Sequence, residues 1–310
     1  MEPNVSQLYS TSELREIGVR YLPNLRRIWA EDFLPHLTPD ERAQAGTVNL
    51  NLPLVGATGY PLEFYSYPIQ RQVFLPIASL KFIDDLAVAY AYYDKMGCDL
   101  GTISDYAAVL RFRPQHVMGS PLDTLGVPRT AINDPYVNDV AQKVLKSIVF
   151  FVAVHEFAHV MHHHKDYKEF EDAQQAQRQE SEADALAVEV MRRIGVPPVG
   201  LTFFFLIASR MEISPGDFDT LAEYELHLRK RATHPLSTQR LLNVAENIEN
   251  NVSAFARLQA DPASWEQRLK AAALSLREIA RTLDDRKMRL FLAERAQRAD
   301  VAAFRLACRR

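Results

Sequence analysis

Cysteine is scarce in this chain: Cys98 and Cys308 are the only two among 310 residues. Two cysteines so far apart argue against a disulfide framework and against a zinc ribbon built from cysteines. A marked excess of charge of one sign is also missing, because the formal net charge is -3. Such a balance gives no electrostatic reason to expect nucleic acid or an anionic membrane as the main partner.

Long hydrophobic runs are missing as well. The two longest apolar stretches lie at 148–154 and 199–209. Both fall short of the roughly 20 residues that cross a bilayer, so we expect them in buried helices. The segment 1–5 has neither the basic nor the apolar region of a signal peptide. We therefore expect no transmembrane segment and a cytoplasmic location.

The composition is that of an ordinary globular protein, with 47% hydrophobic and 24% charged residues. Prolines and glycines between short apolar runs at 48–77 predict strands and turns, and 107–112 is a further strand candidate. The predicted fold class is α+β and mainly helical. We divide the chain into an N-terminal helical and β region (1–77), a core (78–250) and a C-terminal helical extension (251–310). The helices predicted from apolar periodicity and helix-stop signals lie at about 79–96, 138–163, 180–194 and 199–211, with two more after residue 262.

The predicted helix over 138–163 carries His155 and His159, which lie one turn apart on the same face, so both imidazoles can reach one ion. Zinc favours imidazole and carboxylate ligands, and a catalytic zinc site keeps one position for water. Glu156 points to the adjacent side of the helix, where it can hold that water and take its proton. The pattern predicts one Zn²⁺ per chain, with Glu156 as the general base.

A third ligand must come from another segment or from later on the same helix. His162 and His163 follow the motif, but one straight helix cannot easily wrap three successive side chains around one tetrahedral ion. We favour Glu180 on the next helix, which shares a face with Asp184. Asp184 would then accept a hydrogen bond from the second ring nitrogen of a ligand imidazole. Glu182 remains the alternative third ligand.

These motifs resemble a known class of enzymes. The sequence His-Glu-x-x-His at 155–159, followed by Glu-x-x-x-Asp at 180–184, resembles the gluzincin metallopeptidases. The second motif and the Thr-His-Pro segment with its downstream arginine at 233–240 are similar to the family that contains HtpX and the CAAX prenyl endopeptidases. The metzincin pattern is excluded, because it requires a glycine and a histidine where this chain has His162 and Lys165.

The resemblance covers about residues 140–250 and implies a mainly helical peptidase core with Glu180 as the third ligand. It also implies that His234 lies near the site, where it stabilises the oxyanion or gates the metal, and that Arg240 braces that segment. The membrane-spanning helices of many relatives are missing here. The family's substrate-binding strand is not evident before the motif helix either, and residues 107–136 would have to provide it. A similar motif without membrane spans also occurs in the bacterial phage-exclusion metalloproteases.

The sequence thus predicts a zinc endopeptidase that acts on a protein or peptide. Two other functions remain open: a catalytically silent zinc module for regulation or interaction, and a helical scaffold in which the histidine pair is incidental. Glu156 favours the enzyme, because a purely structural zinc site gains nothing from a base there. The leucines of the C-terminal helices would dock on the core, pair with a second copy of the chain or bind another partner.

Overall fold

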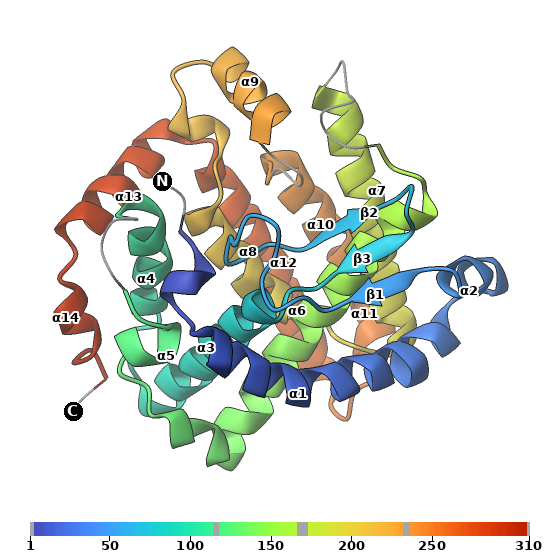
Figure 1. The fold of residues 1–310 in the computed structure, drawn as a ribbon, viewed down its shortest axis with the longest axis horizontal. Helices are drawn as coiled ribbons and strands as arrows, with labels where there is room; N and C mark the ends of the chain where they lie inside the picture. The colour runs from blue at the N-terminus through green and yellow to red at the C-terminus, as the bar shows by residue number, and fades with distance from the viewer. Residues whose placement is uncertain (1–2, 114–117, 166–172, 232–235, 309–310) are drawn as a thin grey trace.

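The structure is a computed structural model that describes residues 3–113, 118–165, 173–231 and 236–308. Helices dominate these residues and one three-stranded sheet accompanies them (Figure 1), so the prediction of a mainly helical α+β chain is confirmed.

The N-terminal part holds η1 (Val5–Gln7), α1 (Thr11–Arg27), the π-helix η2 (Ile28–Phe33), η3 (Leu34–His36), α2 (Pro39–Ala45), β1 (Asn49–Asn51), β2 (Tyr65–Tyr67) and β3 (Gln72–Phe74). The central part holds α3 (Ile77–Met96), α4 (Gly101–Phe112), α5 (Pro121–Thr124), η4 (Arg129–Asn133), α6 (Pro135–Met161), α7 (Ala173–Ile194) and α8 (Gly200–Met211). The remaining part holds η6 (Pro215–Asp217), α9 (Leu221–Arg231), α10 (Thr238–Asn250), α11 (Val252–Ala256), α12 (Pro262–Leu283), α13 (Arg286–Arg298) and α14 (Val301–Phe304).

Helix α6 is the central element of the core and packs against α3, α7 and α8. The side chain of Asp134 accepts hydrogen bonds from the backbone N–H groups of Tyr136 and Val137, and Pro135 occupies the first helical turn. This cap starts the helix three residues before the predicted start at residue 138. By length and composition α6 is apolar enough to cross a membrane, and 83% of that apolar window is buried inside the protein.

The small sheet has the order β1-β3-β2, with β1 parallel and β2 antiparallel to β3. Strand β2 is therefore an edge of the sheet. Because side chains alternate along a strand, Ser66 lies on the face opposite to Tyr65 and Tyr67. Its partner in register is the fully buried Val73, and both β2 and β3 contact α6. On the other face, the ring of Tyr65 stacks on that of Phe74 with centroids 4.6 Å apart.

The prediction of a strand at 107–112 is wrong, because these residues form the second half of α4. The four residues from Ala107 to Leu110 are all buried. A helix that is covered on several sides shows a continuous apolar run without the 3.6-residue period, and such a short run cannot be distinguished from a buried strand by its pattern alone.

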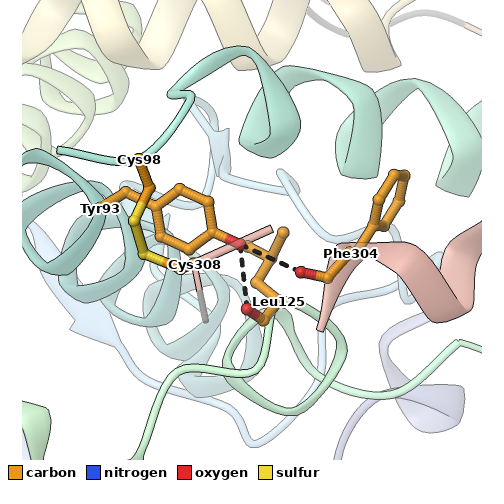
Figure 2. The surroundings of a disulfide bond; sticks show 5 residues. All are labelled: Tyr93, Cys98, Leu125, Phe304 and Cys308. Atoms are coloured by element: carbon orange, nitrogen blue, oxygen red, sulfur yellow. Dashed lines mark hydrogen bonds between the residues drawn. A yellow bond between two sulfur atoms is a disulfide. The ribbon is translucent and has the colours of Figure 1, made fainter. Parts of the chain in front are cut away.

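A single disulfide joins Cys98 to Cys308 across 210 residues (Figure 2), which the low cysteine count did not predict. Beside it, the buried hydroxyl of Tyr93 lies 3.0 and 3.3 Å from the backbone oxygens of Leu125 and Phe304, which share its one proton. The fold thus brings the segment that follows α3 next to the segment that follows α14.

The C-terminal helices dock on the core. Helix α12 packs against α8, α10 and α11, and α13 packs against α4. The buried residues of α12 are Leu269, Ala272, Ala273, Leu276, Ile279, Ala280 and Leu283. Of the three roles considered for this extension, docking on the core is therefore the one present within the chain. The domain boundaries at 77 and 250 stay predictions.

Candidate metal centre

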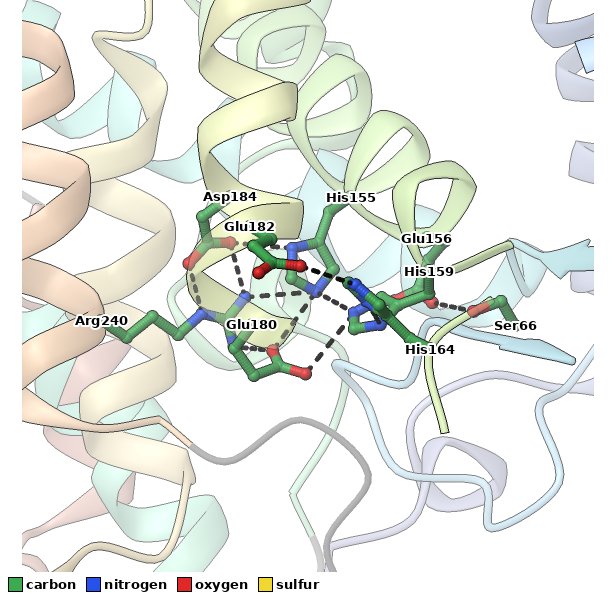
Figure 3. Close-up of polar contacts among 9 residues, drawn as sticks. All are labelled: Ser66, His155, Glu156, His159, His164, Glu180, Glu182, Asp184 and Arg240. Atoms are coloured by element: carbon green, nitrogen blue, oxygen red, sulfur yellow. Dashed lines mark hydrogen bonds and ion pairs between the residues drawn. The ribbon is translucent and has the colours of Figure 1, made fainter. Parts of the chain in front are cut away.

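Two imidazoles and one carboxylate converge at the C-terminal end of α6 (Figure 3). The Nε2 atoms of His155 and His159 lie 3.1 Å apart. Oε2 of Glu180 lies 3.4 Å from Nε2 of His155, and Oε1 of Glu180 lies 3.5 Å from Nε2 of His159. All three side chains are buried, and one ligand atom from each lies within 4.8 Å of the others. These residues are therefore brought together at one point.

Helix α7 supplies the carboxylate from its interior. The helix begins at Ala173, seven residues before the predicted start, so Glu180 lies beyond its first turn. Ala183 and Ala187 are both fully buried and α7 packs along α6. Such small side chains allow two helices to approach each other closely. The close approach places the carboxylate of α7 next to the imidazoles of α6.

A second pair of charged groups supports the three candidate ligands. Nδ1 of His155 lies 2.8 Å from a carboxylate oxygen of Asp184. Arg240 of α10 donates to both oxygens of Asp184, at 2.7 and 3.0 Å, and lies 3.0 Å from Glu180. A carboxylate beside Nδ1 favours the tautomer that carries its proton there, which leaves the lone pair of Nε2 directed to the common point.

The surroundings of Asp184, Arg240 and His155 shift the pKa of each group. Burial raises the pKa of Asp184, but Arg240 and His155 lower it more, so the net shift is below its ordinary value. Burial lowers the pKa of Arg240, and Asp184 and Glu180 raise it more, so it ends above its ordinary value. For His155, burial lowers the pKa and Asp184 outweighs this, which raises the pKa to about 9. Without a metal ion, the cluster thus favours a positive charge on His155.

The donor set and the charge balance both fit a divalent cation. Two imidazoles and one carboxylate are a ligand set of catalytic zinc sites. The carboxyl groups of Glu156, Glu180 and Asp184 and the guanidinium of Arg240 are all buried. With these carboxyl groups ionised and the two imidazoles neutral, as metal binding requires, the cluster has two more negative than positive charges. Buried charge is costly unless it is compensated, and a divalent cation would compensate it.

Glu156 lies beside this cluster, on the adjacent side of α6. Its side chain is buried, and its Oε2 accepts a hydrogen bond of 3.0 Å from the hydroxyl of Ser66 on β2. Sequence reasoning missed Ser66, because 90 residues separate it from Glu156 and a serine in a short strand carries no signal of its own. The contact places the edge strand next to the predicted general base.

Glu182, the alternative third ligand, faces a different residue. Its side chain is 62% exposed, and its carboxylate lies 3.2 Å from Nε2 of His164. His164 is buried, and its Nδ1 lies 2.8 Å from Nδ1 of His159. Burial lowers the pKa of His164, and the contact with Glu182 opposes that shift. The geometry therefore favours Glu180 as the third ligand. His164 is a further member of the cluster that sequence reasoning missed.

The remaining candidates differ in their outcomes. His162 and His163 follow the end of α6 and are exposed, in contrast to the three buried candidate ligands. His234 lies outside the described residues, so its placement near the site stays a prediction. The expectation that Arg240 braces the Thr-His-Pro segment is not tested. In the described residues, Arg240 binds the carboxylates of Asp184 and Glu180.

Residues 123–194 match the family Peptidase U49. The matched segment includes α6 and α7, and hence all three candidate ligands and Glu156, although it is less than a quarter of the chain. The match supports a proteolytic function. No curated protein and no solved structure gave a significant match to this chain.

Proposed function

We propose that this chain is a zinc-dependent endopeptidase of the gluzincin type. The observation that carries the proposal is the buried convergence of His155, His159 and Glu180 from two packed helices, inside the segment that matches a peptidase family. His155, His159 and Glu180 would hold the ion. Zinc, when bound, supplies a Lewis acid that makes a water molecule acidic and polarises a carbonyl group.

The proton transfers fall to Glu156. Its carboxylate takes a proton from the attacking water as the water oxygen forms a bond to the scissile carbonyl carbon. When the bond between that carbon and the amide nitrogen breaks, Glu156 gives the proton to the leaving amine. The hydrogen bond from Ser66 holds the carboxylate in place during both transfers.

The edge strand β2 would bind the substrate. An extended peptide can add a strand to a free sheet edge through backbone hydrogen bonds, and the contact between Ser66 and Glu156 places this edge beside the base. This role was expected of residues 107–136. In the described part of that range the structure has helices and turns, and no strand. Exposed Tyr67 on β2 and exposed Ile69 after it are available to contact substrate side chains.

Metal analysis and a peptide-library digest test the proposal. Wild-type protein is expected to carry about one zinc per chain and to cleave peptides. The Glu156→Gln variant should keep the metal and lose at least about 100-fold in cleavage rate, whereas Glu180→Ala should lose the metal. Asp139→Asn is the matched control, because Asp139 is an exposed acid on the same helix as Glu156.

Three results would contradict the proposal in different ways. Equal cleavage by wild type and Glu156→Gln refutes the role of the base. Stoichiometric zinc without any cleavage identifies a silent zinc module instead. A preparation that binds no zinc and is still active refutes the metal site itself.

A further inference from the structure

Helix α6 ends in a turn that folds the chain back onto its last residues. His163 adopts a left-handed backbone, with φ 52°. The N–H of His164 donates to the carbonyl of His159 at 3.0 Å, and the N–H of His163 donates to that of Val160 at 3.4 Å. These two bonds and the left-handed residue define a Schellman motif, which brings the residue after the left-handed one against the helix residue five positions earlier. Here that pair is His164 and His159.

The two imidazoles meet through their Nδ1 atoms, 2.8 Å apart, with ring centroids at 4.8 Å and ring planes at 75°. Both side chains are buried. A neutral imidazole has one donor and one acceptor nitrogen, so a hydrogen bond between two Nδ1 atoms requires one ring to donate and the other to accept. The direction of this bond therefore depends on where His159 carries its proton.

Metal binding sets that direction. A His159 that offers the lone pair of Nε2 to the metal carries its proton on Nδ1, and it donates that proton to Nδ1 of His164. His164 then carries its own proton on Nε2, which lies 3.2 Å from a carboxylate oxygen of Glu182 and donates to it. The chain of hydrogen bonds thus runs in a single direction, from the candidate ligand His159 through His164 to Glu182.

We propose that His164 is a positioning residue of the metal centre, which holds His159 in the tautomer and orientation that bind zinc, and that Glu182 holds His164. The proposal rests on the proposed function. His155 is held at Nδ1 by the buried Asp184, whereas His159 is held by another imidazole whose far side reaches a largely exposed carboxylate. Loss of such a supporting contact typically costs 10–100-fold in metal affinity.

Zinc affinity, measured by competition with a chromophoric chelator, tests this role apart from catalysis. His164→Phe fills the space of the ring without an acceptor and is expected to weaken zinc binding by about 10–100-fold. His164→Asn keeps an acceptor oxygen near the position of Nδ1 and should stay within roughly 3-fold of wild type. His36→Phe is the control, with the same substitution at an exposed histidine on η3, and should leave the affinity unchanged.

Two further measurements keep the test decisive. The absorption bands of the cobalt-substituted protein report the ligand geometry directly, so they should shift in His164→Phe and stay near those of wild type in His164→Asn. Glu182→Ala changes an exposed side chain that should not be required for folding, and it is expected to weaken zinc binding by roughly 3–10-fold. This variant tests the chain of hydrogen bonds even if His164→Phe does not fold.

Each contrary result has its own meaning. Equal zinc affinity and cobalt spectra for wild type and His164→Phe overturn the role of His164 and leave the proposed peptidase intact. Equal losses in His164→Phe and His164→Asn reduce His164 to a packing residue, which also overturns it. An unchanged affinity in Glu182→Ala overturns the role of Glu182. A wild-type protein that binds no zinc overturns both this inference and the proposed function.

Discussion

Arg240 shows how much of the candidate centre depends on single side chains. It is buried, it donates two hydrogen bonds to Asp184, and it lies 3.0 Å from Glu180. Removing a charge from water is costly, and a buried ion pair recovers this cost only when the geometry is good and the remaining donors are satisfied. The planar guanidinium meets this requirement by binding a carboxylate with two parallel bonds. Arg240 thereby fixes α10 to α7 at the level of the metal centre.

Ser66 allows a first prediction at this scale. Ser66→Ala removes the hydrogen bond to Glu156, and we expect kcat/KM for peptide cleavage to fall by about 10-fold, because a hydrogen bond to a charged group is worth on the order of 1.5 kcal/mol. The zinc content should not change, since Ser66 contacts none of the candidate ligands in Figure 3. Ser66→Thr keeps the hydroxyl and is the control. Cleavage by Ser66→Ala at the wild-type rate would remove Ser66 from the mechanism.

Sequence reasoning at the residue scale identified the residues that share a helical spacing. His155 and His159 lie one turn apart on α6, and Glu180 and Asp184 lie one turn apart on α7, so a local rule was enough to pair them. Ser66 could not be found this way, because its contact with Glu156 depends on the packing of a distant strand on α6.

At the scale of elements, the C-terminal end of α6 is unusual because a residue other than glycine, His163, adopts the left-handed conformation there. The position that glycine usually takes in a Schellman motif is occupied by His163. A left-handed conformation costs an L-residue roughly 1–2 kcal/mol, although histidine adopts it more often than most residues. The end of the helix is therefore locally strained.

This strain gives a prediction for His163. His163→Gly should keep the free energy of unfolding or raise it by up to about 1 kcal/mol, whereas the β-branched side chain of His163→Val should lower it by about 1–2 kcal/mol. Denaturant unfolding measures both. His162→Val is the control, because the φ of His162 is negative, at -85°. Equal stabilities of the valine and glycine variants would show that the left-handed turn does not constrain this position.

Element boundaries were predictable where a strong cap or stop signal is present. Gly97 ends α3 in a left-handed conformation, with φ 65°, at the residue predicted from the sequence. Residues 107–112 were predicted as a strand because they are buried on several sides, so their sequence shows no helical alternation of apolar and polar residues. Helix α7 was assigned too late a start, since its first turns are polar and lack the apolar periodicity that marks a packed helix.

On the scale of the whole molecule, the C-terminal end is attached to the central helices at several points. Arg305 donates to the backbone oxygen of Asp123, and Gln297 donates to that of Phe112. Gly126 has φ 68°, and a Cβ atom there would lie 2.7 Å from the backbone oxygen of Arg305. A side chain at this turn would therefore push the C-terminal segment away, so the turn requires glycine for both its conformation and its close contact.

The disulfide gives a prediction at this scale. Cys308→Ser opens a covalent link that spans 210 residues, and it should lower the free energy of unfolding by about 2–4 kcal/mol, because the unfolded chain regains the freedom that the link removes. Cys98→Ser and the double variant should match it. Zinc binding should persist in all three. If a reductant leaves the unfolding curve of the wild type unchanged, the link contributes nothing to stability.

No local pattern in the sequence predicts the disulfide between Cys98 and Cys308. Whether two distant cysteines meet depends on the arrangement of every element between them. The fold class was accessible for the opposite reason, since it depends on composition and on periods within single segments.

The order of the contributing residues along the chain has a consequence for synthesis. The candidate centre takes Ser66 from β2, two histidines from α6, two acids from α7 and Arg240 from α10. Until α10 has been synthesised, the centre of the nascent chain therefore lacks the guanidinium of Arg240. The candidate centre would therefore be complete only after most of the polypeptide has emerged from the ribosome.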